Sequence, residues 1–288
     1  KGGYFPVNPI DDGQDIRSEM LSTMKRLGMK VDKHHHEVAS CQHELGLIFN
    51  SLTKQGDELQ KYKYVIHNVA QAYGKSATFM PKPIDEGQGS GMHTHMSLFE
   101  GDVNVFHDPG DVLGLSDIAR KFMAGILHHA PEFTAVTNQL INSYKRMVSG
   151  YESPVYVSWA RNNRSALVRV PIHKAGKASS TRIEYRALDS AANPYLAYSV
   201  ILAAGLKGIE DGYELPDEAD ENLWSLNREQ ARKAGLQRLP QDLREALDLM
   251  EESELVRDVL GEHIFEWFIR NKREEWDCLL YTSDAADE

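Results

Sequence analysis

The sequence predicts an α+β protein in which helices flank an antiparallel sheet. Segments with helical periodicity alternate with short strand-like segments, but they do not follow the regular strand–helix–strand order that builds parallel sheets. The C-terminal third is expected to be helical, over residues 228–234, 241–252 and 255–276. Hydrophobic residues make up 41% of the 288 residues, which is enough to bury a sizeable core.

Four further helices are expected before this region. Apolar side chains repeat at helical spacing over 15–27, and Gly28 follows as a stop signal. A helix that begins at residue 117 is expected to end at 129, because Pro131 follows. The other two are expected over 52–73 and over the mostly apolar, and therefore buried, segment 191–209.

Strands are expected between the helices, where β-branched residues or alternating polarity occur. Several of these segments carry charged side chains at alternate positions, and those side chains hold the information about function. The expected strands cover residues 29–38, 43–49, 92–99, 155–159, 166–170 and 181–186.

Composition excludes several classes of protein. The net charge of −11, without a basic run, argues against nucleic-acid binding. No apolar stretch reaches the roughly 18 residues of a membrane span. Two cysteines argue against a disulfide framework and fit a reducing, cytoplasmic setting. Because the chain begins with Lys1 and no leader pattern, we expect it to be a fragment of a longer protein.

Two carboxylates fall on the first pair of strands. If the turn centres on Ser40 and Cys41, Glu37 lies opposite Glu44, and their side-chain roots are about 4.5–5.5 Å apart. A hard divalent cation such as Mg²⁺ or Mn²⁺ would hold two such carboxylates together. Alternatively, both face water at a sheet edge, and this pair alone favours that alternative.

A glycine-rich segment leads into two histidines on the third expected strand. Alternation places His93, His95 and Ser97 on one face, and the glycines before them permit close approach of a ligand to the backbone. One imidazole could bind a metal while the other reaches a phosphate. The alternative is a pair of surface histidines after a flexible loop.

The strand over 181–186 repeats this pattern with Arg182, Glu184 and Arg186 on one face. Glutamate can bind a metal, and guanidinium groups bind phosphate or carboxylate in bidentate fashion. A surface ladder of ion pairs explains the same pattern equally well.

Arginines recur in and after the polar segment 142–154, which is expected to be a mobile loop between glycine and proline signals. Their concentration in an acidic protein favours an anionic, phosphorylated ligand. No P-loop or kinase signature is present. The residues alone therefore indicate a metal-dependent enzyme that handles a nucleotide phosphate and an anionic substrate. The arginines concerned are Arg146, Arg164, Arg169, Arg182 and Arg186.

Taken in order along the chain, the motifs resemble those of bacterial type I glutamine synthetases. They run from Gly2 to about Trp276. The resemblance implies the C-terminal catalytic domain of that family, with the curved antiparallel sheet of the glutamine synthetase and guanido kinase-like fold. The expected domain spans 1–277, the family's N-terminal β-grasp domain is missing, and 278–288 is an atypical tail. The matching motifs cover residues 2–6, 14–17, 34–39, 89–95, 142–146, 182–186 and 192–196.

The resemblance also assigns roles to individual residues. It implies two or more Mg²⁺ or Mn²⁺ ions, one held by Glu37 and Glu44 and another by His93 and Glu184. The implied catalytic residues are Glu152, Arg164 and Arg186. Glutamate is expected to contact Gln88, Gly89, Arg146, Glu152, Arg164 and Arg186. ATP is expected to contact Asp32, Phe49, His95, Ser97, Arg164, Arg169 and Arg182.

The implied activity is the ATP-dependent ligation of ammonia to L-glutamate through a γ-glutamyl phosphate. The family forms hexameric rings that stack into dodecamers, so a homo-oligomer is expected. The family's Glu-x-Glu strand, which supplies a carboxylate to each metal, is absent, and the chain by itself is expected to be inactive. A γ-glutamyl-polyamine synthetase and a catalytically silent structural relative are the alternatives.

Three departures from the family pattern affect these expectations. Gln88 stands where asparagine is usual, and Asp32 stands where a glutamate commonly contacts ribose. Trp224 lies where some members carry a tyrosine that is adenylylated, so that control is expected to be missing.

Overall fold

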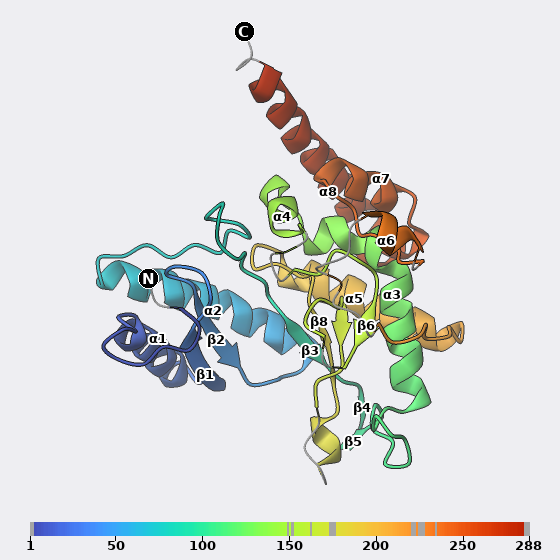
Figure 1. Cartoon of the computed structure of the whole chain (residues 1–288), viewed down its shortest axis with the longest axis horizontal. Helices are drawn as coiled ribbons and strands as arrows, with labels where there is room; N and C mark the ends of the chain where they lie inside the picture. Colours follow the sequence, from blue (N-terminus) through green and yellow to red (C-terminus); the bar gives the residue numbers. More distant parts are fainter. Residues whose placement is uncertain are drawn as a thin grey trace. The chain divides into compact units, whose positions relative to one another are not determined.

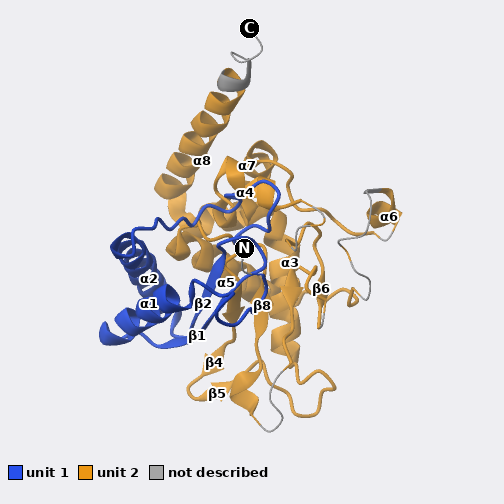
Figure 2. Cartoon of the chain, turned by 60° about the vertical axis from the view of Figure 1, so that its left-hand side comes forward, with its two compact units in different colours: residues 1–90 blue, residues 91–288 orange. Residues whose placement is uncertain are grey.

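A computed structural model describes residues 3–284 of the chain, apart from 149, 151–152, 162, 173–176, 220–222, 224–227 and 234. The chain divides into two compact units, Lys1–Ser90 and Gly91–Glu288 (Figure 2). In the part of the chain that the structure describes, no helix has the length and apolar character that a membrane span needs.

Unit 1 is a β-hairpin packed against two helices. Helix α1 (Gln14–Arg26) precedes strands β1 (Val31–His36) and β2 (His43–Leu47), and α2 (Leu52–Ala72) follows. The helices predicted over 15–27 and 52–73 are confirmed. The inward faces of all four elements form one apolar core, which includes Met20, Met24, Val31, Leu45, Val65 and Val69.

Unit 2 contains a four-stranded sheet in the order β3-β8-β7-β6. Neighbouring strands are antiparallel except β6 and β7, which run parallel. A separate hairpin, β4–β5, and a short 3₁₀ helix lie near the edge of this unit (Figure 1). The bounds are β3 Thr94–Met96, β4 Phe99–Glu100, β5 Val103–Asn104, β6 Trp159–Ala160, β7 Val168–Arg169, η1 Ala178–Ser180 and β8 Ile183–Tyr185.

Helices cover this sheet, and α3 and α5 lie side by side against it (Figure 1). Phe122, Ile126 and Phe133 of α3 are almost fully buried in the same core as Ile183 and Tyr185 of β8. Helix α8 bends at Gly261, and its last turns extend away from the core (Figure 1). The bounds are α3 Asp117–Thr137, α4 Ile141–Arg146, α5 Pro194–Glu210, α6 Arg228–Lys233, α7 Leu243–Glu251 and α8 Glu254–Asp284.

The predicted end of the third helix was wrong. Helix α3 continues through Pro131 to Thr137, although proline removes one backbone donor. Phe133, Ala135 and Val136 are fully buried in the core. Burial of this last turn outweighs the proline penalty of about 3 kcal/mol.

Two other expectations were wrong in part in the same region of the chain. The segment predicted as a mobile loop, 142–154, begins as helix α4, and Arg146 is its last residue. The strand predicted over 155–159 is reduced to Trp159 in β6. Its earlier residues pair outside the sheet, where Val157 N donates to Gln237 O at 2.8 Å and Leu239 N donates to Val155 O at 2.9 Å.

The contact between α3 and α5 depends on glycine. A Cβ atom on Gly125 would lie 2.1 Å from the carbonyl oxygen of Ala204, and one on Gly208 would lie 2.3 Å from that of Lys121. Neither position has a positive φ, so the requirement is space for two backbones rather than an unusual backbone conformation. The two helices therefore approach each other with only hydrogen atoms between their backbones at this crossing.

We predict that Gly125→Ala lowers the free energy of unfolding by about 1–3 kcal/mol, because the added methyl group forces the packed helices apart. Urea denaturation monitored by circular dichroism measures the change. The matched control is Glu210→Ala at the exposed end of α5, which should shift the midpoint little. Equal stability of Gly125→Ala and the unmodified chain would show that the helices do not require this close contact.

Candidate functional site

Glu184 stands at the centre of a cluster of charged side chains in unit 2. It lies on β8, directly opposite His95 of β3 on one side and Arg169 of β7 on the other. Its side chain is only 2% exposed. The period-two repeat of these strands brings side chains from three strands to one place on the sheet.

Four basic groups contact the Glu184 carboxylate. Arg169 donates from Nε to Oε2, and Arg186 donates from Nη1 to Oε1 at 2.9 Å. His93 Nδ1 lies 3.5 Å from Oε1, and His95 Nε2 lies 4.0 Å from the same oxygen. A buried carboxylate needs such partners, because an unpaired buried charge is strongly destabilising.

Two further arginines lie around this centre. Arg182 Nε donates to His95 Nδ1 at 3.3 Å. Arg146 is 3% exposed and donates from Nη1 to Ala187 O at 2.7 Å and from Nη2 to Arg186 O at 3.1 Å. The sequence prediction that Arg182, Glu184 and Arg186 share a face agrees with these contacts.

Gly91 makes room for this arrangement. A Cβ atom there would lie 2.6 Å from Arg146 Nη2 and 3.2 Å from His93 Nε2. This glycine of the glycine-rich segment therefore has a specific use, which is to let an arginine and a histidine pass close to the backbone.

The surroundings of both histidines of the cluster favour the neutral form. Partial loss of hydration at the sheet lowers the pKa of His95 to about 4. Burial, with Arg186 and Arg146 nearby, holds the pKa of His93 well below its usual range. A neutral imidazole keeps a lone pair, which is the form that binds a metal.

Asp189 belongs to the cluster, and sequence reasoning missed it. It is fully buried, and Asn138 Nδ2 donates to its Oδ2 at 3.2 Å. Burial raises the pKa of Asp189, and the nearby positive charge of Arg146 opposes that shift. The position of Asp189 after the arginine-rich strand gave no signal, because an aspartate that follows a strand reads as a turn residue.

Unit 1 brings three potential metal ligands together. His35, Glu37 and Glu44 each offer one ligand atom, and these atoms all lie within 4.8 Å of one another. His35 Nε2 is 2.8 Å from Glu37 Oε1 and 4.0 Å from Glu44 Oε2. His35 Nδ1 is buried and has no hydrogen-bond partner among the described residues.

The predicted pairing of Glu37 with Glu44 was wrong by two residues. Glu44 pairs with His35, and the backbone N of Glu37 donates to Gln42 O at 2.8 Å. The turn sits earlier than expected because Cys41 adopts a left-handed conformation with φ 55°. A shift of two residues keeps each side chain on its own face, so the two carboxylates still meet, with His35 beside them.

Arg17 fixes the hairpin from the side of α1. It is 1% exposed and pairs with Asp11. Its Nε donates to His34 Nδ1 at 3.1 Å, and its Nη1 lies 2.9 Å from His43 Nδ1. Partial loss of hydration, together with the positive charge of Arg17, lowers the pKa of His43 to about 4, so this imidazole accepts a hydrogen bond.

The other predicted residues differ in their surroundings. Gly89 O accepts from Gln42 Nε2 at 2.9 Å, and neighbouring Gln88 is half-buried. Phe49 is 76% exposed and Asp32 is also exposed, whereas Ser97 is half-buried after β3. Arg164 is exposed, and its carbonyl oxygen accepts from Arg186 Nε at 3.1 Å. Glu152 and Trp224 lie outside the described residues.

The sequence profile described as "Glutamine synthetase, catalytic domain" matches residues 1–286. The chain belongs to the glutamine synthetase family. It is 50% identical over 276 residues to the glutamine synthetase of Mycolicibacterium smegmatis. The aligned region covers 96% of this chain and 62% of that protein. It is 45% identical over 275 residues to the glutamine synthetase of Thermotoga maritima, with coverage of 96% and 62%. The chain thus spans about three-fifths of the length of these glutamine synthetases.

Solved structures agree with this family and its fold. A structure described as "GmaS/ADP complex-Conformation 1" superposes with a TM-score of 0.86 at 32% identity. The superposed region covers 98% of this chain and 64% of the chain in that structure. A second, described as "Apo GmaS without ligand", gives a TM-score of 0.84 at 33% identity, with coverage of 97% and 62%. The predicted α+β fold and the predicted resemblance to glutamine synthetase are therefore confirmed.

We predict that Glu184→Gln lowers the free energy of unfolding by about 3–5 kcal/mol, because it leaves buried guanidinium groups without their counter-charge. The matched control is Glu229→Gln, which removes an exposed partner of Lys233 and should leave stability unchanged. Urea denaturation measures both variants. Equal midpoints for Glu184→Gln and the control would show that the arginines do not depend on this carboxylate.

Proposed function

We propose that this chain is the catalytic part of an ATP-dependent carbon–nitrogen ligase that joins ammonia to L-glutamate. The observation that supports this most directly is the buried Glu184 carboxylate surrounded by arginines and neutral histidines, in a chain of the glutamine synthetase family. Phosphoryl transfer needs cations to neutralise charge that develops on phosphate oxygens, and this cluster contains both arginines and side chains that could bind a metal.

The charges of the cluster support an anionic ligand. Glu184 accounts for one negative charge, and Asp189 lies deeper beside Arg146. Arg161 lies in the same stretch of sequence but is paired with Glu218 at 2.8 Å, so it does not take part. The remaining positive charge exceeds the negative charge, and a phosphate or a carboxylate would balance it. The arginines concerned are Arg146, Arg164, Arg169, Arg182 and Arg186.

ATP is the proposed phosphoryl donor. One solved relative is described as an ADP complex, and that protein covers nearly all of this chain. Arg169 and Arg182 stand beside Glu184 and His95, where they could hold phosphate oxygens. The full set of proposed ATP contacts is Asp32, Phe49, His95, Ser97, Arg164, Arg169 and Arg182.

The donor atoms also fit divalent cations. Two carboxylates and one imidazole in unit 1 match Mn²⁺ or Mg²⁺, and the Nδ1 of His35 is buried without a hydrogen-bond partner among the described residues. We assign Glu37 and Glu44 to one ion, with His35 beside them. His93 and Glu184 are assigned to another. Such ions would supply positive charge next to the transferring phosphate.

The arginines are proposed to orient glutamate. Arg146 and Arg186 would bind its carboxylates, with Gln88 and Gly89 at its amino end. The glutamate γ-carboxylate then attacks the γ-phosphate of ATP, which yields γ-glutamyl phosphate and ADP. Arg164 would neutralise charge on the transferred phosphate. Ammonia attacks the acyl carbon, phosphate leaves, and Glu152 would accept the proton released from the nitrogen and exclude water.

The two compact units are proposed to act as one catalytic domain over residues 1–277. Since the relatives are longer than this chain, we propose that the active enzyme also uses residues outside it, including further carboxylates for both metals. We propose that the whole protein works in the cytoplasm as a homo-oligomer of hexameric rings. Regulation by adenylylation would be absent at Trp224, which has no hydroxyl group.

We predict that Arg186→Lys lowers glutamine formation about 100-fold to 1000-fold, because lysine cannot reproduce the planar donor pair. The assay supplies the protein encoded by the full reading frame with MgATP, glutamate and ammonia, and measures glutamine and phosphate. Arg161→Lys is the matched control and should keep full activity.

The same assay with putrescine in place of ammonia separates ligation of ammonia from ligation of a polyamine. Faster turnover with putrescine would reject the proposed acceptor while keeping the ATP chemistry. No ATP-dependent ligation with either amine would reject the proposed function.

We predict that Glu152→Ala binds ATP normally but loses glutamine formation by about 100-fold or more, because it removes the proposed proton acceptor. Calorimetric titration with a non-hydrolysable ATP analogue measures the first property, and the coupled assay measures the second. Glu218→Ala serves as a control for the loss of a carboxylate elsewhere in the unit. Unmodified turnover in Glu152→Ala would contradict the role given to this residue.

A further inference from the structure

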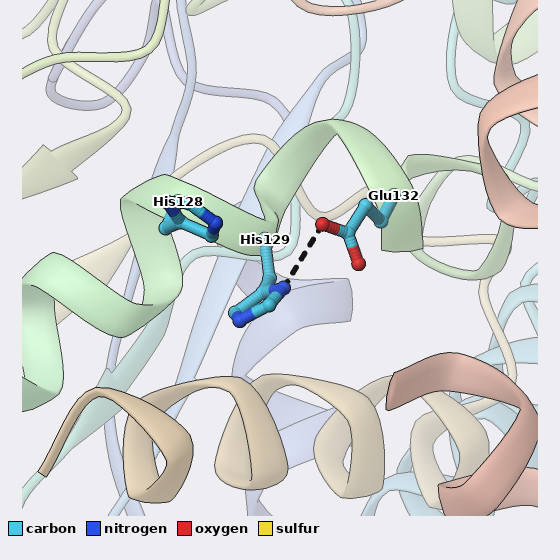
Figure 3. A group of neighbouring side chains, drawn as sticks. All are labelled: His128, His129 and Glu132. Atoms are coloured by element: carbon cyan, nitrogen blue, oxygen red, sulfur yellow. Dashed lines mark hydrogen bonds and ion pairs between the residues drawn. The ribbon is translucent and has the colours of Figure 1, made fainter. Parts of the chain in front are cut away.

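A group of possible metal ligands lies on α3 and shares no residue with the cluster around Glu184. His128, His129 and Glu132 each offer one ligand atom, and these atoms all lie within 4.8 Å of one another. Figure 3 shows the three side chains on adjoining turns of the helix, with His129 facing Glu132. We propose that they form a binding site for a divalent transition metal such as Zn²⁺.

The helix provides the spacing that chelation needs. His128 and Glu132 are one helical turn apart, and residues with that spacing are neighbours on a helix surface. His129 Nδ1 lies 3.0 Å from Glu132 Oε1. Two ligands of a tetrahedral zinc ion, with bonds of about 2.0 Å, are themselves about 3.3 Å apart. The ion would therefore replace the proton that this pair shares, with only a small movement of either side chain.

Residues outside α3 already hold two of the ligands in orientation. Ser253 Oγ donates to Glu132 Oε2 at 2.5 Å, which leaves Oε1 directed at His129. Ser253 is itself fixed, because its Oγ accepts from Val256 N at 3.2 Å at the start of α8. Metal ligands commonly have such second hydrogen bonds, which set the rotamer and the tautomer.

Tyr213 contacts both histidines, as Ser253 contacts Glu132. Its hydroxyl lies 3.4 Å from His129 Nε2, the ring nitrogen that would carry the proton when Nδ1 binds a metal. Its ring also packs against His128, with centroids 4.8 Å apart. Both imidazoles are therefore held by one residue that follows α5.

The donor atoms select a class of metal. Two imidazoles and one carboxylate suit Zn²⁺, Co²⁺, Ni²⁺ or Cu²⁺, whereas Mg²⁺ prefers sites in which most ligands are oxygen atoms. Three protein ligands leave one position of a tetrahedral ion for water.

His128 distinguishes a metal site from an ordinary hydrogen-bonded pair. His129 and Glu132 form a hydrogen bond without any help from His128, which is exposed. If the group serves only as that pair, His128 has no part in it. A metal site, in contrast, requires His128 as the third ligand.

The test measures Zn²⁺ binding to the full chain by calorimetry in excess Mg²⁺, which occupies oxygen-rich sites first. His128→Ala should lower the affinity for one Zn²⁺ at least tenfold, and Tyr213→Phe should lower it about tenfold through loss of the outer hydrogen bond. His263→Ala removes another exposed histidine of unit 2 and should leave Zn²⁺ binding unchanged. Co²⁺ should give the intense visible absorption of a tetrahedral ion in the unmodified chain and lose it in His128→Ala.

Because His128 is exposed, its replacement should preserve the fold, and far-ultraviolet circular dichroism checks this. Glu132→Gln provides a second variant, since glutamine can still accept from Ser253. Equal Zn²⁺ affinity in the unmodified chain and His128→Ala would overturn the proposal. An equal loss in His263→Ala would overturn it as well, because binding would then be a general property of surface histidines.

Discussion

The arrangement of unit 2 depends on the neutralisation of one buried carboxylate. Glu184 sits on a central strand with 2% exposure, where a charge without partners would be very costly. Arg169 and Arg186 supply that compensation, and each must hold its guanidinium group at a fixed place to do so. Their positions then determine where positive charge is available to a ligand. A single structural requirement thus organises the positive charges of the cluster.

In unit 1 the buried charge that needs neutralisation is positive. Arg17 is almost fully buried, and its partners are Asp11 and two neutral histidines, one from each strand of the hairpin. These contacts connect α1 to both strands, close in sequence to Glu37 and Glu44. Two acidic side chains can then stay close to each other, because the backbone beneath them is held by interactions that do not involve them.

Alternation along strands could be read from the sequence, and it correctly placed Glu184 on the same face as Arg186. The strand register was not available in the same way. It depends on the conformation of a turn residue, Cys41, and a non-glycine residue at positive φ has little sequence signal. His35 was missed for the same reason, since it enters the group of ligands only through its pairing with Glu44.

Other misses arose where tertiary packing overrules local preference. Proline signals the end of a helix in an isolated segment, but α3 continues past Pro131 because its last turn is surrounded by core residues from elsewhere in the chain. The sequence also gave no indication that Gly125 and Gly208 must be glycine, because each is required only by the backbone of the other helix. Sequence patterns report the periodicity of one element, whereas these features belong to contacts between two.

The extra turn of α3 matters for the site as well as for the core. Asn138 directly follows its last residue. Asn138 Nδ2 donates to Ala187 O at 2.8 Å, and Arg146 donates to the same oxygen at 2.7 Å. Asn138 also contacts Asp189, the buried acid whose charge lies near Arg146. The last turn of α3 places Asn138 where it makes both of its contacts. The glycine contact with α5 therefore positions not only the helix but also, through Asn138, the backbone that follows β8, to which Arg146 donates.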